Sequence, residues 1–363
     1  MIDFELGDEL ELIRSTARDF AADHVRPVMR AQESARRPSD SALESYTEIG
    51  FATLEWPEAR QGSGLGALAR SLVTEELAAG CPGAALALDP VGPALYPLLE
   101  FGGESALETY AEPLLDLTGS RAVVVWNGAG SRSEISLESD HVRGRVPWVP
   151  ADRVDLMVVL DETSATVVGT ELALTPVRGG GLRTAGGSEI EFQDAKIIQR
   201  WQGAEAASRS LARIRLDTAA SILGVMRESA EYSRDYALDR VAFGKPIAHH
   251  QALAFLIADM ATAVDSARLL IWEAAFRLDR GEDAREACAT AFLEAAEQAL
   301  FVTPNGVQIL GGHGFMQDHP VEKFMREARN LSLLWGGVDL AREEAGAELA
   351  NSEGHIALSL EAH

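Results

Sequence analysis

The apolar residues in the first third of the chain recur at the spacing of a helix. One stripe, whose members are three or four positions apart, is formed by Leu6, Leu10, Ile13, Ala17 and Phe20. The pattern predicts a helix that ends before Pro27, because the residue before a proline is disfavoured in helical backbone. Further helices are predicted over residues 41–49, capped by Gly50, and over residues 67–79. We therefore expect an all-α domain over residues 1–118.

The pattern changes from helical to strand-like near Gly119. Short β-branched runs, separated by turn-forming residues, cover residues 123–126, 154–160 and 165–168. Residues 189–193 alternate between polar and apolar side chains, as a half-buried strand does. A middle β domain is therefore predicted over residues 119–200.

Helical periodicity returns after Ala204. Apolar residues keep a spacing of three or four from Leu253 to Ile271, and residues 213–239 and 284–302 carry similar stripes. Long helices with polar outer faces bury such stripes in a bundle. We expect a C-terminal helical bundle over residues 201–363, and an α+β multidomain fold for the whole chain.

The charge balance and the cysteine count exclude several classes of function. Thirty-two basic and 56 acidic side chains give a formal net charge of -24, which disfavours nucleic acid and anionic membrane surfaces as partners. Cys81 and Cys288 are too few for a disulfide framework, and the adjacent His249 and His250 point in different directions on a helix, so no metal site is expected. The acidic N-terminus does not read as a targeting peptide, and no apolar run reaches the roughly 20 residues of a membrane helix. We expect a cytoplasmic protein.

Two long motifs near the end of the chain carry the most specific information. Residues 240–251 read RVAFGKPIAHHQ, and residues 308–329 read QILGGHGFMQDHPVEKFMREAR. Both motifs resemble those of the acyl-CoA dehydrogenase family of flavoproteins. The resemblance implies that family's fold, in which an N-terminal helical domain, a middle β-barrel domain and a C-terminal four-helix bundle follow one another. It also implies FAD as the cofactor.

In the family these two motifs contact the FAD of a neighbouring subunit. The resemblance assigns this role to six residues of the present chain, namely Arg240, Phe243, Gln251, Gln308, Gly311 and Gly312. A guanidinium suits a phosphate, and glycines let a ligand approach the main chain closely. We expect these residues to bind cofactor.

The catalytic base of the family is missing from this sequence at both places where relatives carry it. Gly336 stands where the family has a Glu that removes a proton from the acyl chain, and Ile214 stands at the alternative Glu position. Arg215 matches a family Arg near the CoA and is the candidate substrate-binding residue. Asp339 could replace the base, although such a residue more often caps a helix. We expect no catalytic residue, and leave the role of Asp339 open.

Other family contacts to a subunit's own flavin are also replaced. Residues 126–132 lack the usual Thr-Glu-Pro element, and Pro150 and Val338 stand where the family has hydroxyl residues. The residues that contact a subunit's own flavin in the family are replaced, whereas those that contact a neighbour's flavin are preserved. This contrast leads to one hypothesis. The chain is a non-catalytic subunit, in an α2β2 assembly with a catalytic acyl-CoA dehydrogenase subunit that oxidises an acyl-CoA and passes electrons to an acceptor.

Two alternatives remain open on the sequence. The first is a homo-oligomeric flavin enzyme, repurposed in specialised metabolism for chemistry that needs no α-proton base. The second is a scaffold or regulatory paralogue that binds a partner and no flavin.

Overall fold

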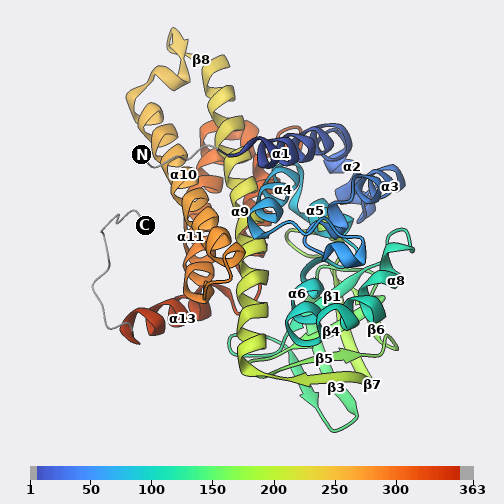
Figure 1. Ribbon diagram of the computed structural model, residues 1–363. Helices are drawn as coiled ribbons and strands as arrows, with labels where there is room; N and C mark the ends of the chain where they lie inside the picture. The colour runs from blue at the N-terminus through green and yellow to red at the C-terminus, as the bar shows by residue number, and fades with distance from the viewer. Residues whose placement is uncertain (1–5, 352–363) are drawn as a thin grey trace.

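The computed structural model describes residues 6–351 and consists of a helical region, a curled sheet and a second helical region (Figure 1). The first region contains α1 (Asp8–Phe20), α2 (Met29–Ala35), α3 (Asp40–Ile49), α4 (Ala67–Gly80), α5 (Pro82–Leu88), α6 (Leu95–Pro97), α7 (Gly103–Ala106) and α8 (Glu112–Leu115). The Ser39 hydroxyl caps α3 at its start, and Gly50, in the left-handed conformation at a φ of 85°, ends it. The three helices predicted from the sequence here are confirmed within a few residues at each end.

Helix α4 joins the N-terminal helices to the C-terminal ones. Its Glu75 and Glu76 are buried, and Glu76 accepts hydrogen bonds from Arg227 at 2.6 Å and from Arg18 at 2.9 Å. Burial alone would raise the pKa of Glu76, but the hydrogen bonds and charges of these arginines lower it to about 2. The buried carboxylate is therefore held ionised between two regions that are distant in sequence.

A seven-stranded sheet forms the middle of the chain. Its strands are β1 (Ala122–Trp126), β2 (Glu134–Leu137), β3 (His141–Val149), β4 (Leu156–Leu160), β5 (Ser164–Val168), β6 (Ala173–Pro176) and β7 (Ser188–Gln202). Their order is β1-β4-β5-β7-β3-β2, with β6 also paired to β7. Only the pair β1 and β4 is parallel, and the long β7 connects the two halves of the sheet. The sheet is curled into a half-barrel that has apolar clusters on both faces.

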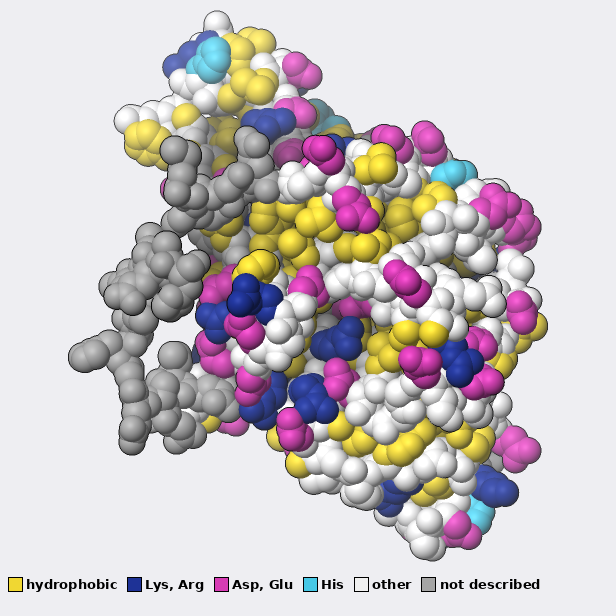
Figure 2. All heavy atoms as spheres, viewed as in Figure 1, with side chains coloured by type: hydrophobic (Ala, Val, Ile, Leu, Met, Phe, Trp, Pro, Cys, Tyr) yellow, Lys and Arg dark blue, Asp and Glu magenta, His cyan; other side chains and the backbone are white. Residues whose placement is uncertain are grey.

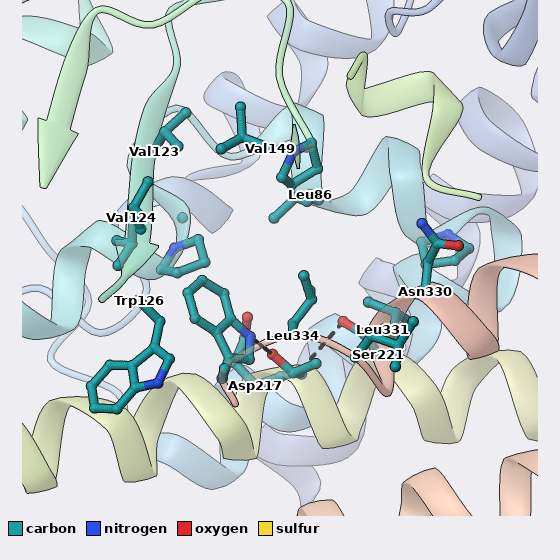
Figure 3. A pocket seen from close by; sticks show the side chains of 18 of the residues that line it. Leu86, Val123, Val124, Trp126, Val149, Asp217, Ser221, Asn330, Leu331 and Leu334 are labelled. Atoms are coloured by element: carbon teal, nitrogen blue, oxygen red, sulfur yellow. Dashed lines mark hydrogen bonds between the residues drawn. The ribbon is translucent and has the colours of Figure 1, made fainter. Parts of the chain in front are cut away.

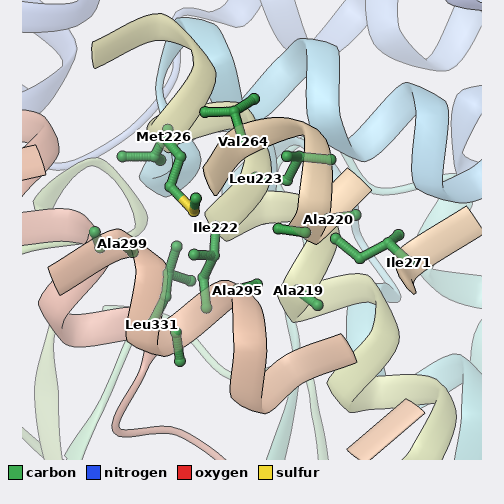
Figure 4. Packing of buried hydrophobic residues seen from close by; sticks show 14 of the residues in the cluster. Ala219, Ala220, Ile222, Leu223, Met226, Val264, Ile271, Ala295, Ala299 and Leu331 are labelled. Atoms are coloured by element: carbon green, nitrogen blue, oxygen red, sulfur yellow. The ribbon is translucent and has the colours of Figure 1, made fainter. Parts of the chain in front are cut away.

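The C-terminal region is built from three long helices and two shorter ones. These are α9 (Ala204–Asp239), α10 (Gln251–Asp279), α11 (Arg285–Leu310), α12 (Val321–Leu331) and α13 (Gly337–Asn351). Small residues such as Ala219, Ala295 and Ala299 let the helices approach closely, and larger ones such as Ile222 and Leu331 fill the space between them (Figure 4). Helix α11 continues past Pro304, beyond the predicted end at residue 302.

The order of helices, sheet and helices confirms the predicted fold class. None of the helices within residues 6–351 has the length and apolar character needed to cross a bilayer. Figure 2 shows acidic side chains spread over the visible face, as the net charge of -24 requires.

Candidate functional site

A cavity of about 540 Å³ lies where the three regions of the chain meet. Its walls come from α4, from β1 and β3, from α9 and from residues 329–339. In Figure 3, Val124 of β1 lies on one side of this space and Asp217 and Ser221 of α9 lie on the other, and Leu334 projects into it. A cavity of this size is typical of a small-molecule site.

One wall of the cavity is charged. The Arg70 guanidinium of α4 lies between Asp89 and Asp217, at 2.9 Å from a carboxylate oxygen of each. Thr74 also donates a hydrogen bond of 2.7 Å to Asp217. Burial alone would lower the pKa of Arg70, but the two carboxylates raise it well above its usual value. Asp217 is therefore a carboxylate in the cavity wall, yet it is engaged by a cation and poorly suited to act as a base.

Arg121, at the start of the sheet, is a second cation in the cavity wall. It is 8% exposed, and its guanidinium donates hydrogen bonds to the backbone carbonyls of Leu86, Asp89 and Pro150. Burial lowers the pKa of Arg121 to about 10. Sequence reasoning missed both Arg70 and Arg121, and the signal available was an Arg inside an otherwise apolar segment.

Gly336 lies against the altered loop of residues 126–132. Its φ is +83°, and a Cβ placed on it would come within 2.4 Å of Leu340 Cδ2 and 3.1 Å of the Ala129 carbonyl oxygen. A Cβ on Gly130 would in turn come within 2.8 Å of the Gly336 carbonyl oxygen. The two glycines therefore pack against each other, and neither position has room for a larger residue.

The neighbouring Trp335 supplies the side chain that this segment sends towards the cavity. Its indole N–H donates a hydrogen bond of 2.8 Å to the Thr218 hydroxyl on α9. The interpretation of the sequence placed the missing carboxylate at Gly336. In the structure both residues line the cavity, but an added Cβ on Gly336 would lie 2.4 Å from Leu340 Cδ2, so Trp335 supplies the large side chain of this segment.

The residues at the alternative base position are buried in the protein interior. Ile214 is fully buried in the apolar cluster between α9 and the sheet. Arg215 is 1% exposed, forms an ion pair with Glu344 of α13 and donates a 3.1 Å hydrogen bond to the Trp335 carbonyl. Burial lowers the pKa of Arg215. Arg215 is not among the described residues that line the cavity, and its substrate-binding role stays a prediction.

Asp339 lies at the edge of the cavity, in the first turn of α13. Its side chain is 92% exposed and pairs with Arg342 at 3.5 Å. An exposed carboxylate at a helix start stabilises the helix dipole. This placement favours the capping interpretation over a catalytic one.

The residues of the first preserved motif lie on a projecting hairpin. Arg240 ends α9, Gln251 begins α10, and strands β8 (Val241–Ala242) and β9 (Lys245–Pro246) connect them (Figure 1). Phe243 is at the tip, with a φ of +53° and 97% exposure. Figure 2 shows hydrophobic side chains at this end of the molecule, beside His and basic side chains. An exposed aromatic ring on a hairpin tip is suited to contact a partner molecule.

The second preserved motif lies at the same end of the helical region. Gln308 is exposed near the end of α11, and Gly311 and Gly312 follow it in a 3₁₀ turn, Gly311–Phe315, where added Cβ atoms would meet nothing. A 2.7 Å hydrogen bond between Tyr236 and His313 joins this turn to the end of α9. The structure thus brings the six predicted cofactor-binding residues to one exposed end of the molecule.

This end is distant from the chain's own cavity. Ser221 is the last residue of α9 in the cavity wall, and Arg240 follows it by roughly 28 Å at about 1.5 Å per helical residue.

Within residues 6–351, no group of three or more His, Cys, Asp or Glu side chains is arranged to hold a metal ion. Cys81 and Cys288 are buried free thiols.

Comparison with known proteins identifies related sequences over nearly the whole chain. Residues 7–118 match the model of the acyl-CoA dehydrogenase N-terminal domain, and residues 201–349 match that of the C-terminal domain. The chain is 28% identical over 378 aligned positions to the mitochondrial short-chain specific acyl-CoA dehydrogenase of Bos taurus, covering 96% of this chain and 92% of the relative. It is 27% identical to the short-chain specific enzyme of Clostridium acetobutylicum, covering 92% and 96%.

Solved structures share the fold. Butyryl-CoA dehydrogenase from Megasphaera elsdenii superposes with a TM-score of 0.84 at 24% identity, over 96% of this chain and 100% of that one. A chain from a study of the electron transferring flavoprotein of Acidaminococcus fermentans gives 0.84 at 25% identity, over 97% and 100%. A structure of PigA with FAD and proline gives 0.83 at 22% identity, over 96% and 99%.

Proposed function

Because the chain belongs to the acyl-CoA dehydrogenase family, we propose that it is the non-catalytic subunit of a heteromeric, FAD-dependent acyl-CoA dehydrogenase. The complex would introduce an α,β double bond into an acyl-CoA thioester. The observation that carries the proposal is spatial. The preserved flavin-contact residues are exposed at one end of the molecule, and the losses surround a cavity roughly 28 Å away along α9.

Among the described residues that line the cavity, Asp89 is paired with Arg70 and Asp339 is 92% exposed at the edge, so no buried, unpaired carboxylate is positioned there. Gly336 carries no side chain, Ile214 is buried in an apolar cluster, and Asp217 is paired with Arg70. A positioned general base is commonly worth roughly 10² to 10⁴ in rate. This loss supports a chain that does not abstract the α-proton by itself.

The cavity and the exposed end of the molecule around Arg240 differ in how well they fit FAD, the cofactor of this family. At the cavity, Pro150 offers no backbone N–H and Val338 no hydroxyl, so two donors that the family resemblance expects beside the flavin ring are replaced. At the exposed end, Arg240 is an exposed cation that can bind a phosphate, while the 97% exposed Phe243 ring can pack on the cofactor. FAD supplies the hydride acceptor when bound. The exposed residues make half of a site, which a catalytic partner would complete.

One observation favours a second candidate function. The cavity persists at about 540 Å³, and two buried donors from its lining residues, Arg121 Nε and Trp148 Nε1, have no acceptor among the described residues. A repurposed enzyme or ligand-binding paralogue would use such a cavity. It would bind its ligand as a homo-oligomer, without a catalytic partner.

The test is co-expression with a catalytic family member from the same source. Alone, the chain should purify without stoichiometric FAD, and the co-purified complex should show a flavin spectrum and oxidise an acyl-CoA. Its reduced flavin should pass electrons to a separate electron-transfer protein. A lone homomer with stoichiometric FAD and acyl-CoA turnover would refute the proposal.

A matched pair of variants tests the exposed end. Arg240→Ala should lower FAD retention in the complex by about tenfold, because it removes a charged phosphate contact worth roughly 1.5 kcal/mol or more. Arg234→Ala is the control, since Arg234 is an exposed α9 residue that pairs with Asp235. Equal FAD retention in the two variants would instead favour a scaffold that binds no flavin.

A further inference from the structure

We propose that two tyrosines and two histidines form a pH-sensitive latch that holds the exposed turn Gly311–Phe315 against α9. This ring cluster consists of Tyr232 and Tyr236 of α9, His313 of the turn, and His319 of the segment between the turn and α12. The latch goes beyond the proposed function, because it lies within this chain and acts without a partner or a cofactor. It bears on the proposed function only through Gly311 and Gly312, which the turn carries.

Each histidine of the ring cluster is bound to one tyrosine. The hydroxyl of Tyr236 lies 2.7 Å from His313 Nδ1, and the hydroxyl of Tyr232 lies 2.7 Å from His319 Nδ1. Burial raises the pKa of Tyr232, so its hydroxyl keeps its proton and donates it to an uncharged imidazole. While the imidazoles are uncharged, the two hydrogen bonds tie the turn and the segment after it to α9.

The two imidazoles also lie against each other. Their ring centroids are 5.7 Å apart at an interplanar angle of 26°, and the Tyr236 ring stands edge-on to both, at 82° to His313 and 84° to His319. Histidine is the side chain whose charge normally changes between about pH 8 and pH 5. At acid pH two cations would face each other at this separation, and their repulsion opposes the closed arrangement. The stacked pair is therefore stable only while at most one imidazole is charged.

Charged groups on the neighbouring elements do not neutralise a doubly charged pair. Arg30 of α2 is a further cation beside it, because its guanidinium donates to the backbone carbonyls of Gln317 at 3.1 Å and His319 at 2.8 Å. Three nearby carboxylates on α2, α9 and α12 are already paired, namely Glu33 and Glu322 with Arg30, and Glu228 with Arg26. Three others are exposed to solvent, which screens their charge, namely Glu231 and Asp235 of α9 and Asp318 beside His319.

His313 is the member of the pair that can move away. It is exposed, in a turn where an added Cβ on Gly311 or Gly312 would meet nothing. His319 is half-buried, and Arg30 fixes its backbone to α2. Release of His313 from Tyr236 would therefore free the turn and displace the two glycines at acid pH.

The experiment is hydrogen–deuterium exchange of the isolated chain, followed by mass spectrometry at pH 8 and pH 5.5. The reporting amides are those of Met316 and His319, which donate to the carbonyls of His313 and Met316 and exchange when the turn opens. Relative to the intrinsic exchange rate at each pH, their protection in wild type should fall about tenfold from pH 8 to pH 5.5. Both pH values lie well above the pKa of Glu76, about 2, whose protonation would weaken the fold as a whole.

His313→Asn and His319→Asn each leave one imidazole, so that no pair of cations can form. Protection in either variant should change by less than about twofold between the two pH values, because the repulsion between the two charges is gone. His141→Asn is the matched control, since His141 is a partly exposed histidine of β3 in the sheet. It should keep the tenfold change of wild type.

Tyr232→Phe and Tyr236→Phe separate the pH response from a general loosening of the turn. Each removes one hydroxyl and keeps the ring, so protection at pH 8 should fall by about fivefold, the value of one hydrogen bond. Protection should still fall further at pH 5.5, because both imidazoles remain.

Equal protection of wild type at the two pH values would overturn the inference. So would a fall in His313→Asn and His319→Asn as large as that in wild type. Neither result bears on the proposed function, since the readout needs no partner and no cofactor. Stoichiometric FAD with acyl-CoA turnover in the lone homomer would instead refute the proposed function and leave the latch standing.

Discussion

Replacing Gly336 by Glu, the residue that the family resemblance expects there, should destabilise the protein and should not restore a base. Two costs follow from the structure. A non-glycine residue at a φ of +83° costs about 1–3 kcal/mol. Its Cβ would also lie 2.4 Å from Leu340 Cδ2 and 3.0 Å from Leu340 Cβ, and such overpacking typically costs about 1–3 kcal/mol. We expect a total loss of about 2–6 kcal/mol.

The measurement is urea unfolding followed by circular dichroism, with Gly346→Glu as the matched control. Gly346 lies within α13, the helix that begins directly after Gly336, and an added Cβ there would meet nothing. Since glycine inside a helix is about 1 kcal/mol less favourable than alanine, the control should be neutral or slightly stabilising. The double variant Gly336→Glu/Leu340→Ala, compared with Leu340→Ala alone, removes the 2.4 Å contact with Cδ2 and leaves the backbone strain and the 3.0 Å contact with Cβ.

The reasoning would be wrong if Gly336→Glu were as stable as wild type. It would also be wrong if that variant alone gained acyl-CoA dehydrogenation, because an added Cβ at 336 lies 2.4 Å from Leu340 Cδ2 and the side chain cannot be held there without a local rearrangement.

Two further predictions concern acid stability and the projecting hairpin. The folded pKa of Glu76, about 2, lies below the usual value of about 4.3 for an unfolded Glu, so its contribution is complete above pH 5 and is lost as pH falls from about 5 to 2. Urea unfolding of wild type across this range should show a falling free energy of unfolding. Glu76→Gln removes one partner of a buried pair, so it should be about 3–5 kcal/mol less stable at pH 7, and its free energy of unfolding should depend less on pH in this range. The same pH dependence in the variant and in wild type would contradict the lowered pKa of Glu76. Phe243→Ser should leave the isolated chain's unfolding free energy within about 0.5 kcal/mol, since the ring is 97% exposed, and should weaken the complex with the catalytic partner in a pull-down titration. A large loss of stability in the isolated chain would show that the ring packs within its own subunit.

The helices were predicted well from the sequence because helix formation and capping depend on residues that are only a few positions apart. The stripe of residues 6–20 and the left-handed cap at Gly50 each depend on neighbours within a few positions. Strand β3 (His141–Val149) was missed although Arg143 and Arg145 occupy the exposed positions of an alternating pattern, because Gly144 and Pro147 weaken its strand signal. Pro147 is tolerated because the pairing with β7 shifts register between Val146 and Val149, where a ladder hydrogen bond is not required.

The candidate site could be predicted only where motifs carried it. The motifs around Arg240 and Gly311 named residues that the structure brings together at one end. The Arg70 pairs with Asp89 and Asp217 depend on how α4 packs on α9, and no local pattern contains that information. The same holds for Trp335, whose orientation is fixed by the distant Arg215 and Thr218.

The losses around the cavity are structurally coupled. Gly130 of the altered loop packs on the backbone of Gly336, so that a side chain at either position would collide with the other segment. A larger residue at 130 therefore requires the backbone of Gly336 to move, and one at 336 requires Leu340 and the Ala129 carbonyl to shift. At Gly130 and Gly336, therefore, a single substitution meets a steric barrier that is set by the facing segment. The exposed residues around Arg240 face no such barrier, since their neighbourhood within the described chain is open, and contacts made there with a partner's cofactor can persist independently of the cavity.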